Sequence, residues 1–330
     1  MKRSIKIMAL VAPLLACAAA RAQTPLEDLA ARVEIRPFQS LTLSDGQFLK
    51  GDAAGQPVTL GGALRFPQTA TGAKIPAVIL VHGSGGVSPG VDAWQFALNR
   101  AGIATFVIDS FSSRGLTSVS TNQALLGRFN MTLDTFRAWE TLAKHPRIDP
   151  ERIAIIGYSR GGSAVIYSTL RRFQKQWSPD FRVAATIAMY PSCFDHIDGD
   201  EDVVGPIREY HGDLDDYAST QKCKAWIGRL KNAGKDVAST EYKDAAHSFD
   251  MPTGVPAPAT SVNKGSQSQR DCAVVEKAGE LVNEATGLPF TYKDACVALD
   301  PHSNYNAVAT EKTRAEVFAL FGEKLTMAGK

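Results

Sequence analysis

Residues 153–173 contain a strand-like run, a glycine-rich turn and a helix-like run in immediate succession. The run Ile153–Ile156 is wholly apolar, as in a strand buried on both faces. The pentapeptide Gly157-Tyr-Ser-Arg-Gly161 follows it and leads into a helical pattern over 163–173. So tight a turn strains its central residue, and a Cβ at either glycine would collide with the adjacent strand and helix. We therefore predict that Ser159 stands above a sheet edge as a nucleophile, a merely structural turn being the alternative.

Strand-like and helix-like segments alternate around this turn from residue 76 to residue 242, which predicts an α/β fold. The sheet should be mostly parallel, with helices on both faces, and an antiparallel hairpin over 38–49 and 58–66 should form its edge. Strands are expected at 76–81, 103–108, 153–156, 183–190, 206–210 and 237–242, and helices at 94–100, 133–145, 163–173, 219–233 and 311–327.

The length of 330 residues favours a single α/β domain with insertions over two separate domains. Residues 251–305 are rich in Pro, Gly, Ser and Asn and should form a loop-rich insertion before the final helix. A short helix is expected inside it, near 272–283. The predicted domain covers residues 23–330.

The first 22 residues have the pattern of a cleaved signal peptide. A basic start is followed by an apolar stretch over 7–20, and Ala20-Arg-Ala22 offers the cleavage site before Gln23. The stretch is too short to span a bilayer, so the mature protein should be periplasmic or secreted. Lipid attachment at Cys17 is the less favoured alternative.

The balance of charge gives no sign of a nucleic-acid partner. The chain has 36 basic and 34 acidic residues, and cleavage before Gln23 removes four basic residues and no acidic one, leaving a net charge of −2. No membrane span is expected, and oligomeric state cannot be read from the sequence.

Four cysteines remain after cleavage, an even number that suggests two disulfides in an oxidising compartment. Three pairings are possible. We favour Cys193 with Cys223 and Cys272 with Cys296, the second of which would close the insertion. Four free buried thiols are the alternative.

A serine hydroxyl needs a general base, and the base needs an acidic partner. In a parallel sheet these groups belong on loops at the carboxyl ends of strands. Asp215 is the favoured acid and His247 the favoured base, since the order Ser, Asp, His is that of α/β-hydrolases. Asp213 and Asp216 are alternative acids, and His302 is the alternative base.

Two backbone N–H groups are expected to stabilise the oxyanion of the reaction. The residue after the nucleophile, Arg160, supplies one. The other should come from the turn His82-Gly-Ser-Gly-Gly86, with Ser84 favoured and Gly85 as the alternative.

Metal chemistry is not expected. Asp198, Asp200, Asp202 and Glu209 have the spacing of a calcium loop, but Val203 stands where the loop requires glycine. No Cys or His pair has zinc spacing and no phosphate-binding loop is present. The predicted chemistry therefore uses no cofactor.

Several segments together resemble the dienelactone hydrolase family of the α/β-hydrolase superfamily. They are Pro76–Gly86, Asp109-Ser-Phe111 with Arg114, Gly157–Gly161, Gly212-Asp-Leu-Asp-Asp216 and His247-Ser-Phe-Asp250. The resemblance implies Asp215 as acid, His247 as base and hydrolysis of esters or lactones without a metal. The chain departs from the namesake enzymes in having Ser159 where they have cysteine, and in its export signal and insertion.

We thus expect a serine hydrolase that cleaves a small-molecule ester or lactone through an acyl-enzyme on Ser159. A peptidase of the same superfamily and a non-catalytic binding protein that retains the fold are the alternatives. Expected pocket liners are Trp94, Phe111, Arg114 and Tyr158, and Arg114 is a candidate for binding a substrate carboxylate.

Overall fold

The computed structural model of the protein describes residues 32–68 and 74–325. The predicted signal peptide and its cleavage site lie outside these residues. Within the described ranges, no helix combines the length and the apolar character that crossing a membrane requires.

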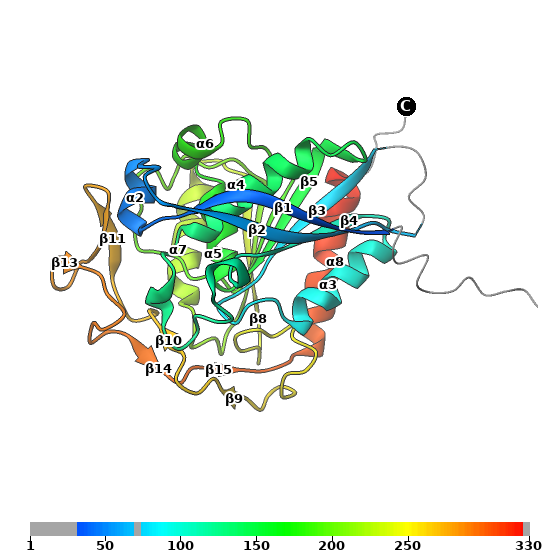
Figure 1. Cartoon of the computed structure of the whole chain (residues 1–330). Helices are drawn as coiled ribbons and strands as arrows, with labels where there is room; N and C mark the ends of the chain where they lie inside the picture. The colour runs from blue at the N-terminus through cyan, green and yellow to red at the C-terminus, as the bar shows by residue number, and fades with distance from the viewer. Residues whose placement is uncertain (1–31, 69–73, 326–330) are drawn as a thin grey trace, which may run out of the picture. The chain divides into compact units, whose positions relative to one another are not determined.

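An eight-stranded sheet forms the centre of the fold, with the strand order β1-β2-β4-β3-β5-β6-β7-β8 (Figure 1). The first two strands form an antiparallel hairpin that joins the sheet through the antiparallel pair β2 and β4. All other neighbours are parallel. The strands are β1 (Val33–Thr42), β2 (Gln56–Arg65), β3 (Ile75–Val81), β4 (Ala104–Asp109), β5 (Ile148–Tyr158), β6 (Thr186–Met189), β7 (Ile207–Gly212) and β8 (Val237–Tyr242).

Helices cover both faces of this sheet, so the predicted α/β architecture is confirmed (Figure 1). On β3, Ile79 packs into the core that α4, α5 and α7 share, while Leu80 packs into the core beneath α3 and α8. This alternation follows from the two-residue period of a strand, and it explains why the run 75–81 is apolar throughout. The helices are α2 (Asp45–Lys50), α3 (Pro89–Arg100), α4 (Asn130–Ala143), α5 (Arg160–Ser168), α6 (Arg171–Trp177), α7 (Thr220–Asn232) and α8 (Ala307–Lys324).

The predicted antiparallel pairing of the edge hairpin is confirmed, but its first strand ends at Thr42 and not at residue 49. Residues 45–50 form helix α2 rather than continuing the strand. Ser44 caps this helix by accepting from the N–H of Gln47, whose side chain in turn accepts from the N–H of Ser44. The helix ends at Gly51 in the left-handed conformation. This local capping chemistry, present in the sequence, outweighs the apolar alternation.

The single helix predicted over 163–173 is wrong, because Thr169 and Leu170 separate α5 from α6. Leu170 has extended backbone angles and pairs with Val203 in an isolated bridge. Tertiary pairing here overrides the helical pattern.

The helix predicted near 272–283 is also wrong. Strands β11 (Val274–Lys277) and β12 (Glu280–Asn283) form a hairpin there. Its turn residues Ala278 and Gly279 both have positive φ, at 52° and 74°. A turn with two positive φ angles matches the twist of paired strands, and the valines of β11 and β12 favour strand over helix.

Residues 251–305 lie between β8 and α8 and contain the remaining short strands (Figure 1). These strands are β9 (Ser261–Val262), β10 (Gln267–Ser268), β11, β12, β13 (Leu288–Pro289), β14 (Ala298–Leu299) and β15 (His302–Ser303). Both expected disulfides are present, Cys193–Cys223 in the body of the fold and Cys272–Cys296 within this segment. Disulfides of this kind are typical of proteins that fold in an oxidising compartment.

Candidate active site

Ser159 sits at the sharp junction between β5 and α5. Its φ of 53° and ψ of −115° lie in a sparsely populated region for a residue with a side chain. The junction closes only because its glycines have no side chain: a Cβ on Gly157 would lie 2.1 Å from the carbonyl oxygen of Gly161, and a Cβ on Gly161 would lie 2.2 Å from that of Val81. The strain expected from the sequence is therefore present at Ser159.

The structure brings Ser159, His247 and Asp215 into one chain of hydrogen bonds. The Nε2 atom of His247 lies 2.9 Å from Ser159 Oγ, and its Nδ1 lies 2.8 Å from Asp215 Oδ2. The other carboxylate oxygen, Oδ1, accepts from the backbone N–H groups of Tyr217 and Ala218, each at 2.9 Å. These bonds fix Asp215 as an acceptor, so His247 donates from Nδ1 and leaves Nε2 free to accept from the serine.

Asp215 stays ionised although its side chain has no exposed surface. Burial alone acts to raise the pKa of Asp215, but the charge and hydrogen bond of His247, with a further contribution from His211, hold it below its ordinary value. His211 lies behind the carboxylate, with Nε2 at 3.7 Å from Asp215 Oδ2 and Nδ1 bonded to Glu209.

The alternative acids and base lie elsewhere. Asp213 is exposed at the surface. Asp216 binds His302 of the 251–305 segment, accepting from its backbone N–H at 2.7 Å and lying 2.8 Å from its Nδ1. The structure therefore joins the rival residues Asp216 and His302 to each other and not to Ser159.

The predicted oxyanion turn lies beside the serine, as a Cβ on Gly83 would be 3.2 Å from Ser159 Cβ. His82 shapes this turn through bonds to the Gly83 carbonyl (2.8 Å) and the Ser110 N–H (3.1 Å). Burial lowers the pKa of His82, which suits a neutral ring that donates from Nδ1 and accepts at Nε2. The Ser84 carbonyl accepts from the N–H of Val119 at 2.8 Å.

A cavity of about 160 Å³ opens in front of Ser159. Within the described chain, His247 is the one lining residue of the types that carry a charge near neutral pH. The 251–305 segment contributes Met251, Asn263 and Ser266 to the wall. Most of the lining offers hydroxyl groups, from Ser84, Ser88, Ser120, Tyr158, Tyr190, Tyr217, Ser248 and Ser266.

Of the four expected pocket liners, only Tyr158 lies in the cavity wall. Trp94 is fully buried and donates to Asp250, while Phe111 packs edge-on against His82. The side chain of Arg114 is only 4% exposed, and its guanidinium binds both oxygens of Asp134, at 2.7 and 2.9 Å. The guanidinium of Arg114 is therefore buried in an ion pair with Asp134 and does not line the cavity in front of Ser159.

Two tyrosines beside His247 were missed by the sequence analysis, and Asp250 was named only as part of a motif. The imidazole of His247 lies between the rings of Tyr190 and Tyr217, with centroid distances of 4.8 and 4.6 Å. Tyr190 donates to Asp250 at 2.8 Å, and Asp250 also accepts from Trp94 at 2.7 Å. Burial raises the pKa of Asp250. The His-x-Phe-Asp motif signalled Asp250, but no local pattern signals Tyr190 or Tyr217.

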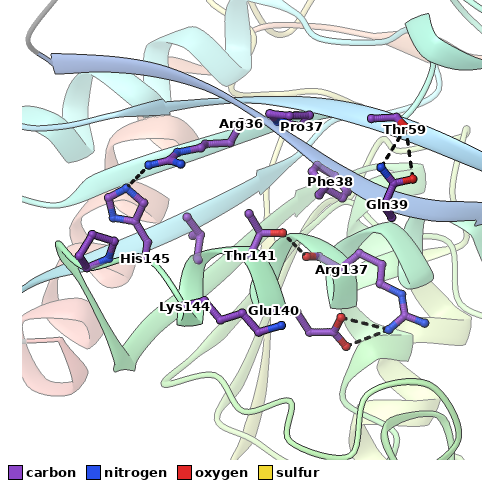
Figure 2. A pocket seen from close by; sticks show the side chains of 12 residues that line it. Arg36, Pro37, Phe38, Gln39, Thr59, Arg137, Glu140, Thr141, Lys144 and His145 are labelled. Atoms are coloured by element: carbon purple, nitrogen blue, oxygen red, sulfur yellow. Dashed lines mark hydrogen bonds and ion pairs between the residues drawn. The ribbon is translucent and has the colours of Figure 1, made fainter.

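A larger hollow, of about 710 Å³, lies away from Ser159 between β1 and α4 (Figure 2). Four of its side chains bind one another in pairs: Arg36 contacts His145 at 2.7 Å, and Arg137 contacts Glu140 at 2.8 Å. It contains no member of the Ser-Asp-His chain.

One group of metal-ligand types clusters closely among the described residues, formed by Glu209, His211 and Cys223. Cys223 is bound in a disulfide, and His211 is bonded to Glu209. The group therefore does not offer three free ligands.

Comparisons with known proteins identify the family and the fold of this chain. The sequence model of the dienelactone hydrolase family matches residues 61–286. No curated protein matches the chain. Among solved structures, a dienelactone hydrolase-like promiscuous phosphotriesterase, P91, from metagenomic libraries is 15% identical, with a TM-score of 0.58 over 89% of this chain and 100% of its own. A putative dienelactone hydrolase from Klebsiella pneumoniae is 14% identical, with a TM-score of 0.54 over 88% of this chain and 99% of its own.

At these identities the solved structures establish a shared α/β-hydrolase fold, and the sequence model establishes the family. The match covers all parallel strands, the Gly-x-Ser-x-Gly turn and both loops that carry Asp215 and His247. This chain belongs to the dienelactone hydrolase family.

Proposed function

We propose that this member of a hydrolase family is a serine esterase, with Ser159 as nucleophile, His247 as general base and Asp215 as the acid that orients it. The observation that carries the proposal is the unbroken hydrogen-bond chain from Ser159 Oγ through both nitrogens of His247 to Asp215. An imidazole that is hydrogen-bonded to a buried carboxylate can accept the serine proton, because the carboxylate stabilises the imidazolium cation that forms.

The reaction follows from this arrangement. His247 Nε2 removes the proton from Ser159 as Oγ attacks the carbonyl carbon of the ester. The oxyanion of the tetrahedral intermediate binds the N–H groups of Ser84 and Arg160. The alcohol then leaves with the proton from His247, and an acyl group remains on Ser159. A water activated by His247 hydrolyses that bond and releases the acid.

The cavity supports a small uncharged ester or lactone as substrate. Its volume of about 160 Å³ is below the ~300–1,000 Å³ of ordinary ligand pockets. No arginine or lysine among the described residues lines it, and the candidate cation Arg114 is bound to Asp134. A carboxylate on the substrate would lose its hydration there without gaining a cation as its partner.

The first experiment measures hydrolysis of p-nitrophenyl acetate by the mature protein, with and without EDTA. Ser159→Ala should lower kcat by at least ~10³-fold because it removes the nucleophile, and EDTA should change nothing. Ser168→Ala is the matched control, since the Ser168 hydroxyl binds only a carbonyl of its own helix, at 2.7 Å.

Retained turnover in Ser159→Ala would refute the nucleophile. If the wild type shows no turnover, an alkyl phosphonate label decides between a pocket that rejects the ester and a binding protein. Labelling at Ser159 indicates the former, and no labelling indicates the latter.

The second experiment compares p-nitrophenyl butyrate with mono-p-nitrophenyl succinate, whose acyl chains have the same length. We expect kcat/KM to be at least ~10-fold lower for the succinate, because its carboxylate finds no cation in the cavity. Hydrolysis of the octanoate should also be slower than that of the acetate. Equal rates for butyrate and succinate would contradict the uncharged substrate class.

We propose further that the enzyme is exported by a cleaved signal peptide over residues 1–22 and is periplasmic or secreted. The two disulfides support an oxidising compartment. We also propose that residues 23–330 form one domain in which 251–305 is an insertion covering the site, supported by the three side chains it adds to the cavity wall. The mass of the intact exported protein, together with its N-terminal sequence, tests the cleavage before Gln23.

A further inference from the structure

One buried side chain connects the two residues from which the oxyanion donors are proposed to come. Gln123 is 4% exposed and begins a short 3₁₀ helix, Gln123–Leu125. Its side-chain oxygen Oε1 accepts from Arg160 Nη1 at 2.7 Å. The Ser84 hydroxyl lies 3.1 Å from the same oxygen and 3.0 Å from Gln123 Nε2.

We propose that Gln123 is a positioning residue that holds the oxyanion hole, and that the 251–305 segment fixes it in place. The inference rests on the proposed function. Backbone N–H groups stabilise an oxyanion only when their positions are fixed before the reaction, because movement during the reaction would cost the energy that they supply. A shared partner for Ser84 and Arg160 fixes their separation.

The guanidinium of Arg160 makes this connection strong. It is buried away from water, and burial lowers the pKa of Arg160 to about 10. Its Nη atoms bond to three oxygen acceptors: Gln123 Oε1, the Gln123 carbonyl at 3.3 Å and the Leu126 carbonyl. Two of the three belong to Gln123, so the arginine is anchored mainly through this residue. A buried donor that loses its acceptor pays its full desolvation penalty.

Ser84 is held from the opposite side as well. Its carbonyl accepts from the Val119 N–H at 2.8 Å and from the Ser118 hydroxyl at 3.1 Å. In the described chain, none of the backbone hydrogen bonds outside helices and strands uses the N–H of Ser84 or of Arg160. Both donors are therefore free for a ligand, while the atoms around them are fixed.

The 251–305 segment completes the arrangement through Gln267. Gln267 Oε1 accepts from the Gln123 N–H at 2.9 Å, and the Gln267 N–H donates to the Ser120 carbonyl at 2.9 Å. Gln267 thus binds the loop that carries Gln123 through both its side chain and its backbone.

The test compares Gln123→Leu with Gln123→Glu and Gln267→Leu on p-nitrophenyl acetate. The leucine keeps the volume but removes both partners, whereas the glutamate keeps an acceptor for Arg160 and Ser84. We expect kcat to fall by ~10–100-fold in Gln123→Leu at a KM within about twofold, with partial rescue in Gln123→Glu. Gln267→Leu should lose less than Gln123→Leu.

A second readout separates positioning from a general loss of structure. A methyl trifluoromethyl ketone forms a tetrahedral adduct on Ser159 whose oxygen occupies the oxyanion hole, and its inhibition constant should rise by the same factor as kcat falls. Gln174→Leu is the control, because Gln174 is also a buried glutamine, bonded through Nε2 to the Ser168 carbonyl at 2.9 Å. It should lower thermal stability while leaving both kcat and the inhibition constant of the ketone unchanged.

The inference is overturned if folded Gln123→Leu keeps kcat within about twofold of the wild type, or if kcat falls while ketone affinity is unchanged. Should Gln123→Leu fail to fold, Gln267→Leu decides in the same way. Absence of turnover in the wild type would instead refute the proposed function, so the two failures are distinguishable.

Discussion

A second imidazole, that of His211, lies behind the carboxylate of Asp215. His211 and Glu209 are both fully buried, and Glu209 also accepts from the Ser239 hydroxyl. Burial alone would lower the pKa of His211, but the Glu209 carboxylate, with smaller contributions from Asp215 and Glu241, raises it above 6.5. When His211 is protonated, charges of alternating sign run from Glu209 through His211 to Asp215.

This pair should make part of the stability of the fold depend on pH. Because folding raises the pKa of His211, the folded state binds the proton more tightly than the unfolded state. The contribution is complete below about pH 6.5 and is lost as the pH rises through the raised value. In urea unfolding between pH 6 and pH 9, the stability difference between wild type and His211→Gln should become smaller with increasing pH.

His196→Gln is the matched control for this experiment, because the side chain of His196 is 52% exposed. Its difference from the wild type should stay small at every pH. A difference for His211→Gln that grows with pH would contradict the assigned direction of the pKa shift.

At the scale of elements, the 251–305 segment is bound to the rest of the fold by specific side-chain contacts. Glu276 of the β11–β12 hairpin binds Arg172 of α6 through two bonds of 2.7 Å. Within the segment, β10 pairs with β14, and the Cys272–Cys296 disulfide joins the chain between them. Gln267 lies in β10, so the disulfide supports the contact with Gln123.

Replacing both cysteines of this disulfide by serine should reduce stability and turnover together. The loop of 24 residues is worth roughly 3 kcal/mol of unfolding free energy on the chain-entropy estimate. We also expect kcat on p-nitrophenyl acetate to fall, since β10 loses its constraint. Urea unfolding and kcat are measured on the same preparations.

The double serine variant of Cys193 and Cys223 is the comparison for stability alone, as it opens a loop of similar length, 30 residues, and should lose a similar amount of stability. Its kcat is not used as the control, because that loop carries Asp215. An unchanged kcat in the variant of Cys272 and Cys296 would contradict the role of this disulfide in holding Gln267.

For the molecule as a whole, the sequence predicted the strands and turns whose conformation depends on residues close together in the chain. The apolar runs of β3 and β5 and the Gly-x-Ser-x-Gly turn identified the parallel sheet and the position of Ser159, and strand order placed Asp215 and His247 near it. The β11–β12 hairpin was missed because its apolar residues suit either a helix or paired strands, and the turn at Ala278 decides between them.

Long-range contacts account for the other errors. Arg114 resembled a substrate-binding residue because no carboxylate close to it in the sequence pairs with it, whereas its partner Asp134 lies 20 residues away on α4. Gln123 carries no local signal at all. Its role depends on Ser84, Arg160 and Gln267, which come from three separate parts of the chain.

The 251–305 segment touches each of the three loops that surround Ser159. His302 binds Asp216, next to Asp215. Asn304 accepts from the N–H of Ala246, next to His247, at 2.8 Å. Gln267 binds Gln123, whose side chain contacts Ser84. A loop graft that reshaped the cavity for a larger acyl group would therefore also disturb the reacting atoms. We therefore expect point substitutions in the cavity wall, at Met251 or Asn263 for example, to change specificity with less loss of turnover than exchange of the whole segment.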